Sequence, residues 1–181
     1  EYAQYWQDAM FDNPELESFQ PDLIFIHTTS RNITEAPLPL SASEQEVRDA
    51  LERQFSHFSQ MWERLHEVYH CPIIQNNFEL PSTRLMGNRD AWDCHGMVWF
   101  IQELNRKFGQ YAASHSDFYL HDLHYLAASY GLDAWHDDSY WYLYKYAMTL
   151  DAVPELAYSL TRIIRSIYGK NKKVLALDLD N

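Results

Sequence analysis

The hydrophobic residues of this chain form short continuous runs separated by longer amphipathic stretches. Leu23–Ile26, Cys71–Gln75 and Phe118–Leu120 are compact, largely apolar runs, and polar residues follow each of them. Runs of this length are typical of strands that are buried on both faces of a parallel sheet. A fourth run, Val174–Leu177, immediately precedes Asp178. The pattern therefore predicts four strands.

The stretches between these runs have the periodicity of helices. Ser43 and Glu46 form a capping-box pattern, and the apolar positions from Val47 to Tyr69 advance by three or four residues, which predicts one long amphipathic helix. Other helices are expected behind Asn13, from an Asp90 cap to about Ser114, from about Asp122 to Gly131, around Tyr140 to Met148, and from Pro154 to Ile167. The alternation predicts an α/β fold, a three-layer sandwich in which helices flank a mostly parallel, flavodoxin-like sheet.

Composition and charge narrow the possible partners and the compartment. The net charge of −12 argues against a nucleic-acid partner, because phosphate contacts require clustered Lys and Arg. No apolar run approaches the roughly 20 residues of a membrane span, so no membrane partner is expected. Two cysteines are too few for a disulfide framework, which favours a cytoplasmic location.

Asp178 and Asp180 are the most suggestive acidic pair. They are two positions apart at the end of the fourth predicted strand, so both side chains point to one side and can share a cation. The segment resembles the first motif, Asp-x-Asp-x-Thr, of the haloacid dehalogenase (HAD) superfamily. That resemblance implies a nucleophile, a general acid and Mg²⁺ binding in the intact protein. The sequence ends before the Thr, so we expect neither phosphatase activity nor a cofactor for this chain alone.

His66, Glu67 and His70 form an H-E-x-x-H pattern. On one helix face, the two imidazoles would bind Zn²⁺ and the carboxylate would act as a base, as in zinc hydrolases. The helix is expected to end at His70, however, and no third ligand is evident. The alternative is a pair of surface histidines.

His121, Asp122 and His124 form a second possible metal cluster, near His115 and Asp117. Imidazole and carboxylate groups at this spacing suit Zn²⁺ or Fe²⁺, but no flanking motif fixes a geometry. The alternative is that Asp122 caps a helix and the histidines lie at a strand end.

Asn32, Asp133 and His136 occur in an order that resembles the SGNH-hydrolase family. The resemblance implies that Asn32 contributes to an oxyanion hole and that Asp133 orients His136 as a general base. The serine nucleophile and an oxyanion-hole glycine of that family would precede Glu1. The alternative makes Asn32 a turn residue and Asp133 a loop cap.

Four sequence segments, taken together in their order along the chain, resemble FkbH-like proteins of HAD subfamily IIIC. They are PDLIFIHTTSRNI, CPIIQNNFELP, RLMGN and GKNKKVLALDLDN. The resemblance implies an SGNH-like domain over residues 1–168, lacking its first strands, and the linker and first strand of a HAD phosphatase domain over 169–181. It further implies glyceryl transfer from a small phosphorylated three-carbon substrate to an acyl carrier protein. The function expected for this chain is to position that substrate or the carrier arm.

A rival hypothesis is a docking or scaffold module without chemistry of its own. A dense aromatic run would then pack in the core or at a partner interface; it comprises Tyr140, Trp141, Tyr142, Tyr144 and Tyr146. Alanine at His136 in the intact protein separates the two hypotheses, because a general base typically contributes a rate factor of about a hundred or more.

Overall fold

The computed structural model describes residues 5–169, which fold as an α/β domain around a parallel sheet. In chain order, with 3-10 helices labelled η, the elements are α1 (Tyr5–Met10), α2 (Pro14–Phe19), β1 (Ile24–Ile26), η1 (Ser30–Asn32), α3 (Glu44–Tyr69), β2 (Ile73–Asn76), η2 (Gly87–Ala91), α4 (Met97–Ser114), β3 (Phe118–His121), α5 (Leu123–Tyr130), α6 (Leu132–Trp135), α7 (Asp138–Tyr144), η3 (Leu150–Ala152) and α8 (Val153–Ile167).

The sheet confirms the three strands expected within the described residues. Its order is β1-β2-β3 and both pairings are parallel, with Ile24 opposite Ile73 and Ile73 opposite Phe118. The run Val174–Leu177, predicted as a fourth strand, lies outside the described residues. Parallel strands bring their carboxyl ends to one edge of the sheet, where chemistry is usually placed in α/β folds.

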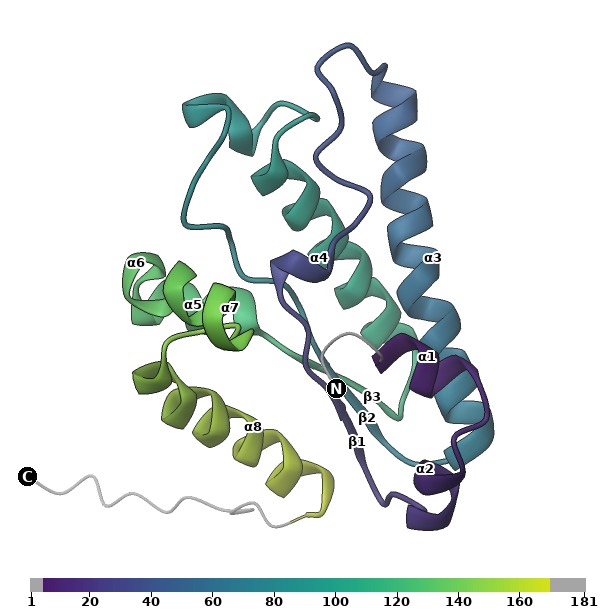
Figure 1. Ribbon diagram of the computed structural model, residues 1–181. Coiled ribbons are helices and arrows are strands. Elements are labelled where there is room, and N and C mark those ends of the chain that lie inside the picture. The colour runs from purple at the N-terminus through teal and green to yellow at the C-terminus, as the bar shows by residue number, and fades with distance from the viewer. Residues whose placement is uncertain (1–4, 170–181) are drawn as a thin grey trace, which may run out of the picture.

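Helices cover both faces of the sheet, as the three-layer prediction requires (Figure 1). Helices α3 and α4 pack together on one face with α1 beside α3, and α8 lies across the other face next to β3. The short helices α5, α6 and α7 gather near the carboxyl ends of the strands. The edge where the strands end is therefore surrounded by loops and short helices.

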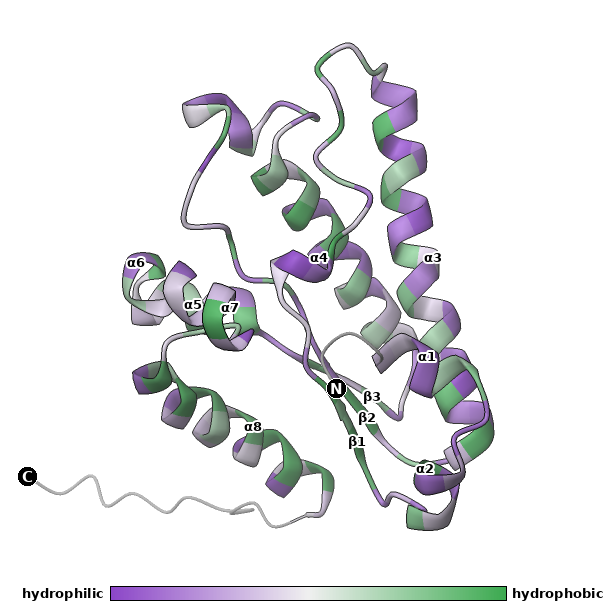
Figure 2. Cartoon of the chain, viewed as in Figure 1, coloured by the Kyte–Doolittle hydropathy of each residue, from purple (hydrophilic) through white to green (hydrophobic). Residues whose placement is uncertain are grey.

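The long helix α3 forms for the reasons predicted from its sequence. Ser43 is its N-cap, and the side chains of Ser43 and Glu46 form the reciprocal capping box. The apolar stripe is buried at Val47, Leu51 and Phe58, among others. Figure 2 shows apolar and polar positions alternating along this helix, consistent with one buried side and one solvated side.

Helix α4 corrects the prediction that Asp90 is its N-cap. The helix begins at Met97 after Gly96, and Asp90 lies in η2. The Asp90 carboxylate is nevertheless buried against the start of α4, because Oδ1 accepts from the Val98 N–H at 2.7 Å and Oδ2 from the Met86 N–H at 3.0 Å. The backbone at Gly96 lies so close to that of Asp90 that a glycine is required, since a Cβ there would lie 2.0 Å from the Asp90 carbonyl oxygen.

Three further expectations need adjustment. The stretch predicted as a loop after β1 contains η1, and the predicted loop at 133–136 contains α6. The aromatic helix expected to reach Met148 ends at Tyr144, because Lys145 adopts a left-handed conformation with φ 61°. Short helices of this kind carry too few residues for periodicity to reveal them.

Among residues 5–169, no helix combines the length and the apolar character that a membrane crossing requires.

Candidate functional site at the carboxyl edge of the sheet

Buried amide side chains organise the carboxyl edge of the sheet. The Asn76 Oδ1 accepts from the Thr28 N–H at 2.9 Å, and the Asn76 Nδ2 donates to the Thr28 carbonyl at 2.6 Å. The Gln75 Nε2 donates to the Thr28 Oγ1 at 2.9 Å, while the Gln75 Oε1 accepts from the Trp62 Nε1 at 3.1 Å. Because Gln75, Asn76 and Thr28 are fully buried, these bonds fix where the chain leaves β1.

Asn32, the predicted oxyanion-hole residue, stabilises η1. Its Oδ1 accepts from the Thr29 N–H at 2.9 Å and thereby completes a capping box with Thr29. This arrangement matches the turn-residue alternative for the Asn32 oxygen. The side chain is not among the residues that line the neighbouring cavity.

Glu79 lies directly beneath η1, and no pattern in the sequence singles it out. Its side chain is 1% exposed. Its Oε1 accepts from the Thr29 Oγ1 at 2.9 Å and from both the Ser30 N–H and Ser30 Oγ at 3.0 Å, whereas Oε2 has no hydrogen-bond partner among the described residues. Burial raises the pKa of Glu79, although its hydrogen bonds with Ser30 and Thr29 and the nearby His136 act in the opposite direction.

His136 lies near Glu79 but does not pair with Asp133. Its Nε2 lies 2.9 Å from the Leu80 carbonyl oxygen, so Nε2 carries the proton and donates it. Asp133 is exposed on α6, and no hydrogen bond joins it to His136 within the part of the chain that the structure describes. His136 leaves α6 with an extended backbone, φ −93° and ψ 140°. The predicted Asp133–His136 dyad is therefore not formed, while a catalytic role for either residue stays a prediction.

A cavity of about 500 Å³ opens above these residues. Ser30, Arg31 and His136 contribute to its wall from η1 and from the end of α6. The other lining residues are Ile33, Ala36, Pro37, Pro81, Ser82, Thr83, Leu85, Met97, Asp138 and Tyr142. The cavity therefore combines hydroxyl groups and one guanidinium with apolar walls, which is the composition of a small-molecule site.

Arg31 supplies the positive charge of this cavity. Its guanidinium forms an ion pair with Asp138 on α7. The same guanidinium lies 4.9 Å from the Trp141 ring centroid and 5.8 Å from that of Tyr142. Contacts with ring faces keep a cation oriented while leaving its donors usable. Arg31 is thus held at the rim by α7.

Other predicted site residues lie elsewhere. Asp178 and Asp180 lie outside the described residues. His66 and His70 are exposed at the end of α3, with ring centroids 6.4 Å apart, and no third donor joins them in residues 5–169. The surface-pair alternative therefore describes their placement.

The cluster around His121 also has an internal explanation. Asp122 caps α5 by accepting from the Tyr125 N–H at 3.2 Å and also accepts from the Asn77 Nδ2 at 2.8 Å. The His121 Nε2 lies 2.9 Å from the Ser159 Oγ on α8. No three-donor group forms here within the described ranges, which matches the helix-cap alternative.

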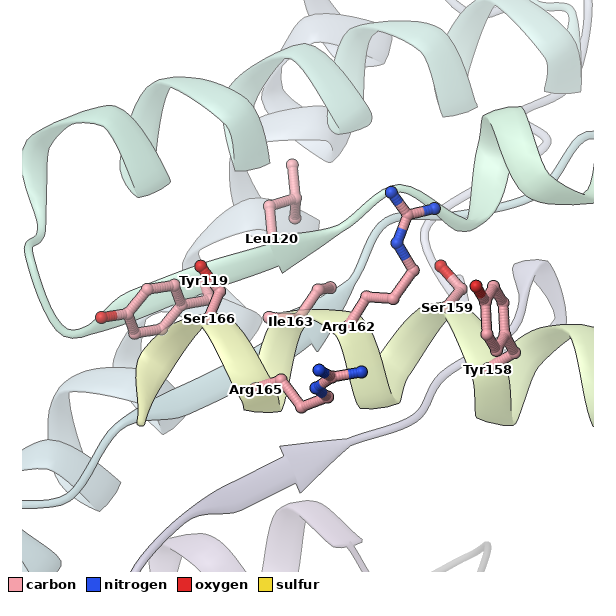
Figure 3. A pocket seen from close by; sticks show the side chains of 8 residues that line it. All are labelled: Tyr119, Leu120, Tyr158, Ser159, Arg162, Ile163, Arg165 and Ser166. Carbon is pink, nitrogen blue, oxygen red and sulfur yellow. The ribbon is translucent and has the colours of Figure 1, made fainter. Parts of the chain in front are cut away.

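A second cavity, of about 730 Å³, lies between α8 and β3 (Figure 3). Tyr119 and Leu120 line it from β3, and α8 contributes Tyr158, Ser159, Arg162, Ile163, Arg165 and Ser166. The Arg162 guanidinium lies 6.0 Å from the Tyr158 ring centroid. None of the residues predicted to form a site lines this cavity.

Comparison with known proteins identifies the family of the chain. The family model of the FkbH N-terminal domain matches residues 1–165 of the chain. A solved structure, the N-terminal part of the protein BF1531 from Bacteroides fragilis, is similar with a TM-score of 0.80 and 23% identity. That structure contains a phosphatase domain and is complexed with Mg. The likeness covers 100% of this chain and 46% of that one. Because the identity is only 23%, the likeness concerns the fold alone. A comparison with curated proteins finds no match.

Proposed function

Because the chain belongs to the FkbH N-terminal domain family, we propose that it is the substrate-positioning domain of a larger phosphatase of HAD subfamily IIIC. In this role it holds a phosphorylated three-carbon substrate, or the arm of an acyl carrier protein, for glyceryl transfer. The SGNH-like assignment of residues 1–168 and the HAD start at 169–181 belong to the same proposal.

The rim of the 500 Å³ cavity carries this proposal. Arg31 offers a planar guanidinium, which suits the oxygens of a phosphoryl group. Ser82 and Thr83 place exposed hydroxyl donors around the same opening. Asp138 is 68% exposed and is the present partner of Arg31, so an incoming phosphoryl group competes with one solvated carboxylate.

The arrangement favours binding over catalysis by this domain. The Ser30 Oγ donates to the Glu79 Oε1 at 3.0 Å rather than to an imidazole, and the His136 Nε2 donates to a backbone carbonyl. In the predicted SGNH-like chemistry the base is an imidazole, which must lie within hydrogen-bond reach of the hydroxyl that it activates. Residual acyl transfer through Asn32, Asp133 and His136 therefore ranks below positioning, and H136A in the intact protein should lower glyceryl transfer by less than about a hundredfold.

Titration with 3-phosphoglycerate, followed by amide chemical shifts, tests the binding role. Resonances of η1 and of residues 81–85 should shift, and R31Q should weaken binding by about tenfold or more because a charged hydrogen bond is lost. D138N should strengthen it, since it removes the competing carboxylate. R53Q is the matched control, because Arg53 pairs with Glu35 and does not line this cavity. Equal affinity for R31Q and R53Q would refute the proposal.

The phosphatase chemistry is proposed for the intact protein only. Asp178 and Asp180 would act as nucleophile and general acid and bind Mg²⁺ there, a role consistent with the Mg complex of the structural neighbour. A cytoplasmic location belongs to the same proposal and agrees with Cys71 and Cys94 both being free thiols. This chain alone should not turn over a generic phosphate ester with Mg²⁺.

Docking of a protein partner is the second candidate, and the exposed aromatic run favours it. No residue of α7 is buried, and Tyr142, Leu143 and Tyr144 are 70%, 71% and 58% exposed. The aromatic run of α7 therefore does not pack in the core. Exposed aromatic residues are enriched at interfaces. Unchanged glyceryl transfer in H136A together with a loss in L143A/Y144A would therefore favour docking, because neither Leu143 nor Tyr144 lines the cavity beside Arg31.

A further inference from the structure

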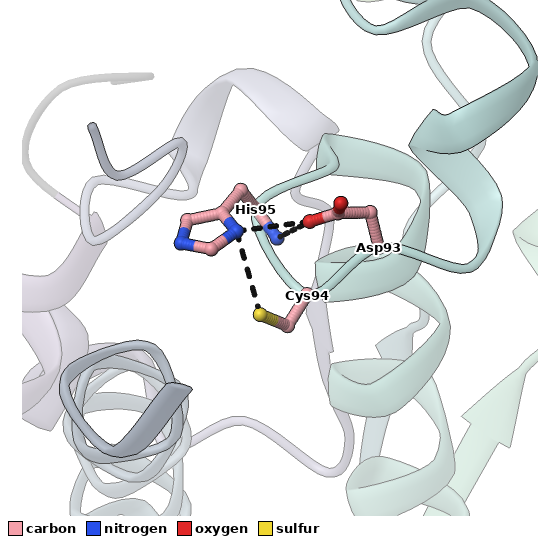
Figure 4. Close-up of side chains that lie close together, drawn as sticks. All are labelled: Asp93, Cys94 and His95. Carbon is pink, nitrogen blue, oxygen red and sulfur yellow. Dashed lines mark hydrogen bonds and ion pairs between the residues drawn. The ribbon is translucent and has the colours of Figure 1, made fainter. Parts of the chain in front are cut away.

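Three consecutive side chains with different donor atoms converge between η2 and α4. Asp93, Cys94 and His95 place a carboxylate oxygen, a thiol sulfur and an imidazole nitrogen within 4.8 Å of one another (Figure 4). The His95 Nδ1 lies 2.9 Å from the Asp93 Oδ1 and 3.5 Å from the Cys94 Sγ. This cluster is separate from the cavity beside Arg31, since none of the three residues lines that cavity.

The orientation of His95 is set from outside the cluster. Its Nε2 lies 2.8 Å from the Ala42 carbonyl oxygen, which can only accept, so Nε2 carries a proton. Metal-binding histidines are commonly fixed in this way, with the second ring nitrogen donating to a carbonyl. The Nδ1 atom then faces the Asp93 oxygen and the Cys94 sulfur. Two lone pairs 2.9 Å apart repel each other unless a proton or a metal ion lies between them.

The same bonds exclude a Cys-His-Asp nucleophile system. In such a triad one ring nitrogen takes the proton of the nucleophile, and the other is held by the carboxylate. Here the Cys94 Sγ and the Asp93 Oδ1 both lie next to Nδ1, and Nε2 donates to the Ala42 carbonyl oxygen. The cluster is therefore a convergent donor set and not an activated thiol.

We propose that Asp93, Cys94 and His95 form a binding site for a thiophilic divalent cation, with Zn²⁺ as the expected ion. Zinc takes thiolate, imidazole and carboxylate donors at about 2.0–2.3 Å, so tetrahedral donors are about 3.5 Å apart. The two separations from the His95 Nδ1, 2.9 and 3.5 Å, are close to that value. Binding replaces the thiol proton of Cys94 and any proton on Nδ1, and both protons are released to solvent.

The surroundings suit three protein ligands and one open position. The side chains of Asp93 and His95 are only 13% and 15% exposed. Arg89 holds the Asp93 Oδ2 in an ion pair, which leaves Oδ1 directed at His95. A cavity of about 660 Å³ lies beside the cluster, and Glu44 and Arg48 also line it. A water molecule from this cavity can therefore complete the coordination.

A bound ion would fix His95 in the orientation that contacts the segment before α3. His95 contacts Ala42, which directly precedes the Ser43 cap of α3, and the cluster directly precedes α4. A ligand that binds only the folded state raises stability by mass action. Metal binding should therefore raise the unfolding temperature of the whole chain as well as produce a spectroscopic signal.

Titration of the full chain with Co²⁺ under reducing conditions tests the site. One equivalent should produce thiolate-to-cobalt charge-transfer absorption and tetrahedral d–d bands, and Zn²⁺ should displace the Co²⁺, following the usual order of metal affinities. C94S should abolish the charge-transfer band. D93N should keep the fold, verified by circular dichroism, and weaken Co²⁺ binding by about tenfold or more.

Two controls use other candidate ligands of the same chain. C71S removes the other cysteine, and H66Q/H70Q removes the H-E-x-x-H pair; both should retain the band and its stoichiometry. The proposal is wrong if folded wild-type chain gives no charge-transfer band, or if the band persists in C94S. Loss of the band in C71S would also overturn it, because the thiolate ligand would then be Cys71.

Discussion

The two faces of the sheet are packed very differently. On the α3/α4 face, Phe58, Trp62 and Phe108 are completely buried, and their ring centroids lie 4.7–6.1 Å apart. On the α8 face, no residue of α8 is buried, although Figure 2 shows its apolar positions along one side. The first face is a close-packed aromatic core, whereas the second leaves the cavity of Figure 3 between helix and strand.

Polar atoms differ between the faces in the same way. The Trp62 Nε1 has its partner in Gln75 on the dense face. On the α8 face, His27 has two buried ring nitrogens and His121 one that find no hydrogen-bond partner within residues 5–169. A closely packed face requires its polar groups to be hydrogen-bonded, because an unpaired buried group lowers the stability of the folded state by about 1–3 kcal/mol. The stability of the domain should therefore reside mainly in the α3/α4 face.

Replacement of Trp62 by alanine should have the largest effect. The indole contacts Phe58, Phe108 and Phe118. Its loss leaves a cavity and leaves the buried Gln75 Oε1 without the hydrogen bond from the Trp62 Nε1. Unfolding in urea should show a loss of about 3–5 kcal/mol. A loss below about 1 kcal/mol would contradict a dense, stabilising face.

Gly96→Ala should destabilise the same face by about 1–3 kcal/mol, the usual cost of overpacking. The new Cβ would lie 2.0 Å from the Asp90 carbonyl oxygen, so the backbone must shift. Gly109→Ala in the interior of α4 is the control, since a Cβ there meets nothing within 4 Å. Thermal unfolding should show G109A more stable by about 0.5–1 kcal/mol, and a similar change of stability in both variants would remove the steric explanation.

One chemical change made on both faces measures their difference directly. Ile101→Ala on α4 removes a fully buried side chain and should cost about 2–5 kcal/mol. Ile163→Ala on α8 removes a half-buried side chain beside the cavity and should cost about 1 kcal/mol, because less apolar surface returns to water. Equal losses in parallel urea titrations would show that the faces are packed alike.

The smallest expected effect is a pH dependence of stability on the α8 face. Burial lowers the pKa of both His27 and His121 below 6.5, and the charge of His27 lowers that of His121 further, while Asp122 opposes this. The unfolded chain therefore binds more protons below pH 6.5, so stability falls as the pH drops from 6.5 through the folded-state pKa values.

The double variant H27Q/H121Q should show a weaker loss of stability between neutral and acidic pH than the wild type. Ser159→Ala removes the hydroxyl beside His121 but keeps both imidazoles, so it should retain the wild-type dependence. Identical pH profiles for wild type and H27Q/H121Q would exclude these histidines as the source. Chemical denaturation at a series of pH values provides the comparison.

Local signals in the sequence were sufficient for the principal elements. The apolar runs of β1, β2 and β3 and the capped stripe of α3 are visible without tertiary information, because their periods and caps lie within a few consecutive residues. The α/β class follows from the order of these elements. The segments that resemble FkbH-like proteins likewise lie along the chain, and the family match over residues 1–165 confirms the FkbH resemblance for the segments within that range.

Side-chain partnerships were decided by the tertiary structure alone. Asp133 and His136 are three residues apart, yet they diverge because Leu80, 56 residues from His136 in sequence, supplies the hydrogen-bond acceptor. Glu79 lies under Ser30 through a similarly non-local contact, across 49 residues of sequence. The tripeptide Asp93-Cys94-His95 is plain in the sequence, but its value as a donor set depends on Ala42, 53 residues from His95. Periodicity reports which way a residue faces, whereas the partner it meets depends on chain segments that only folding brings together.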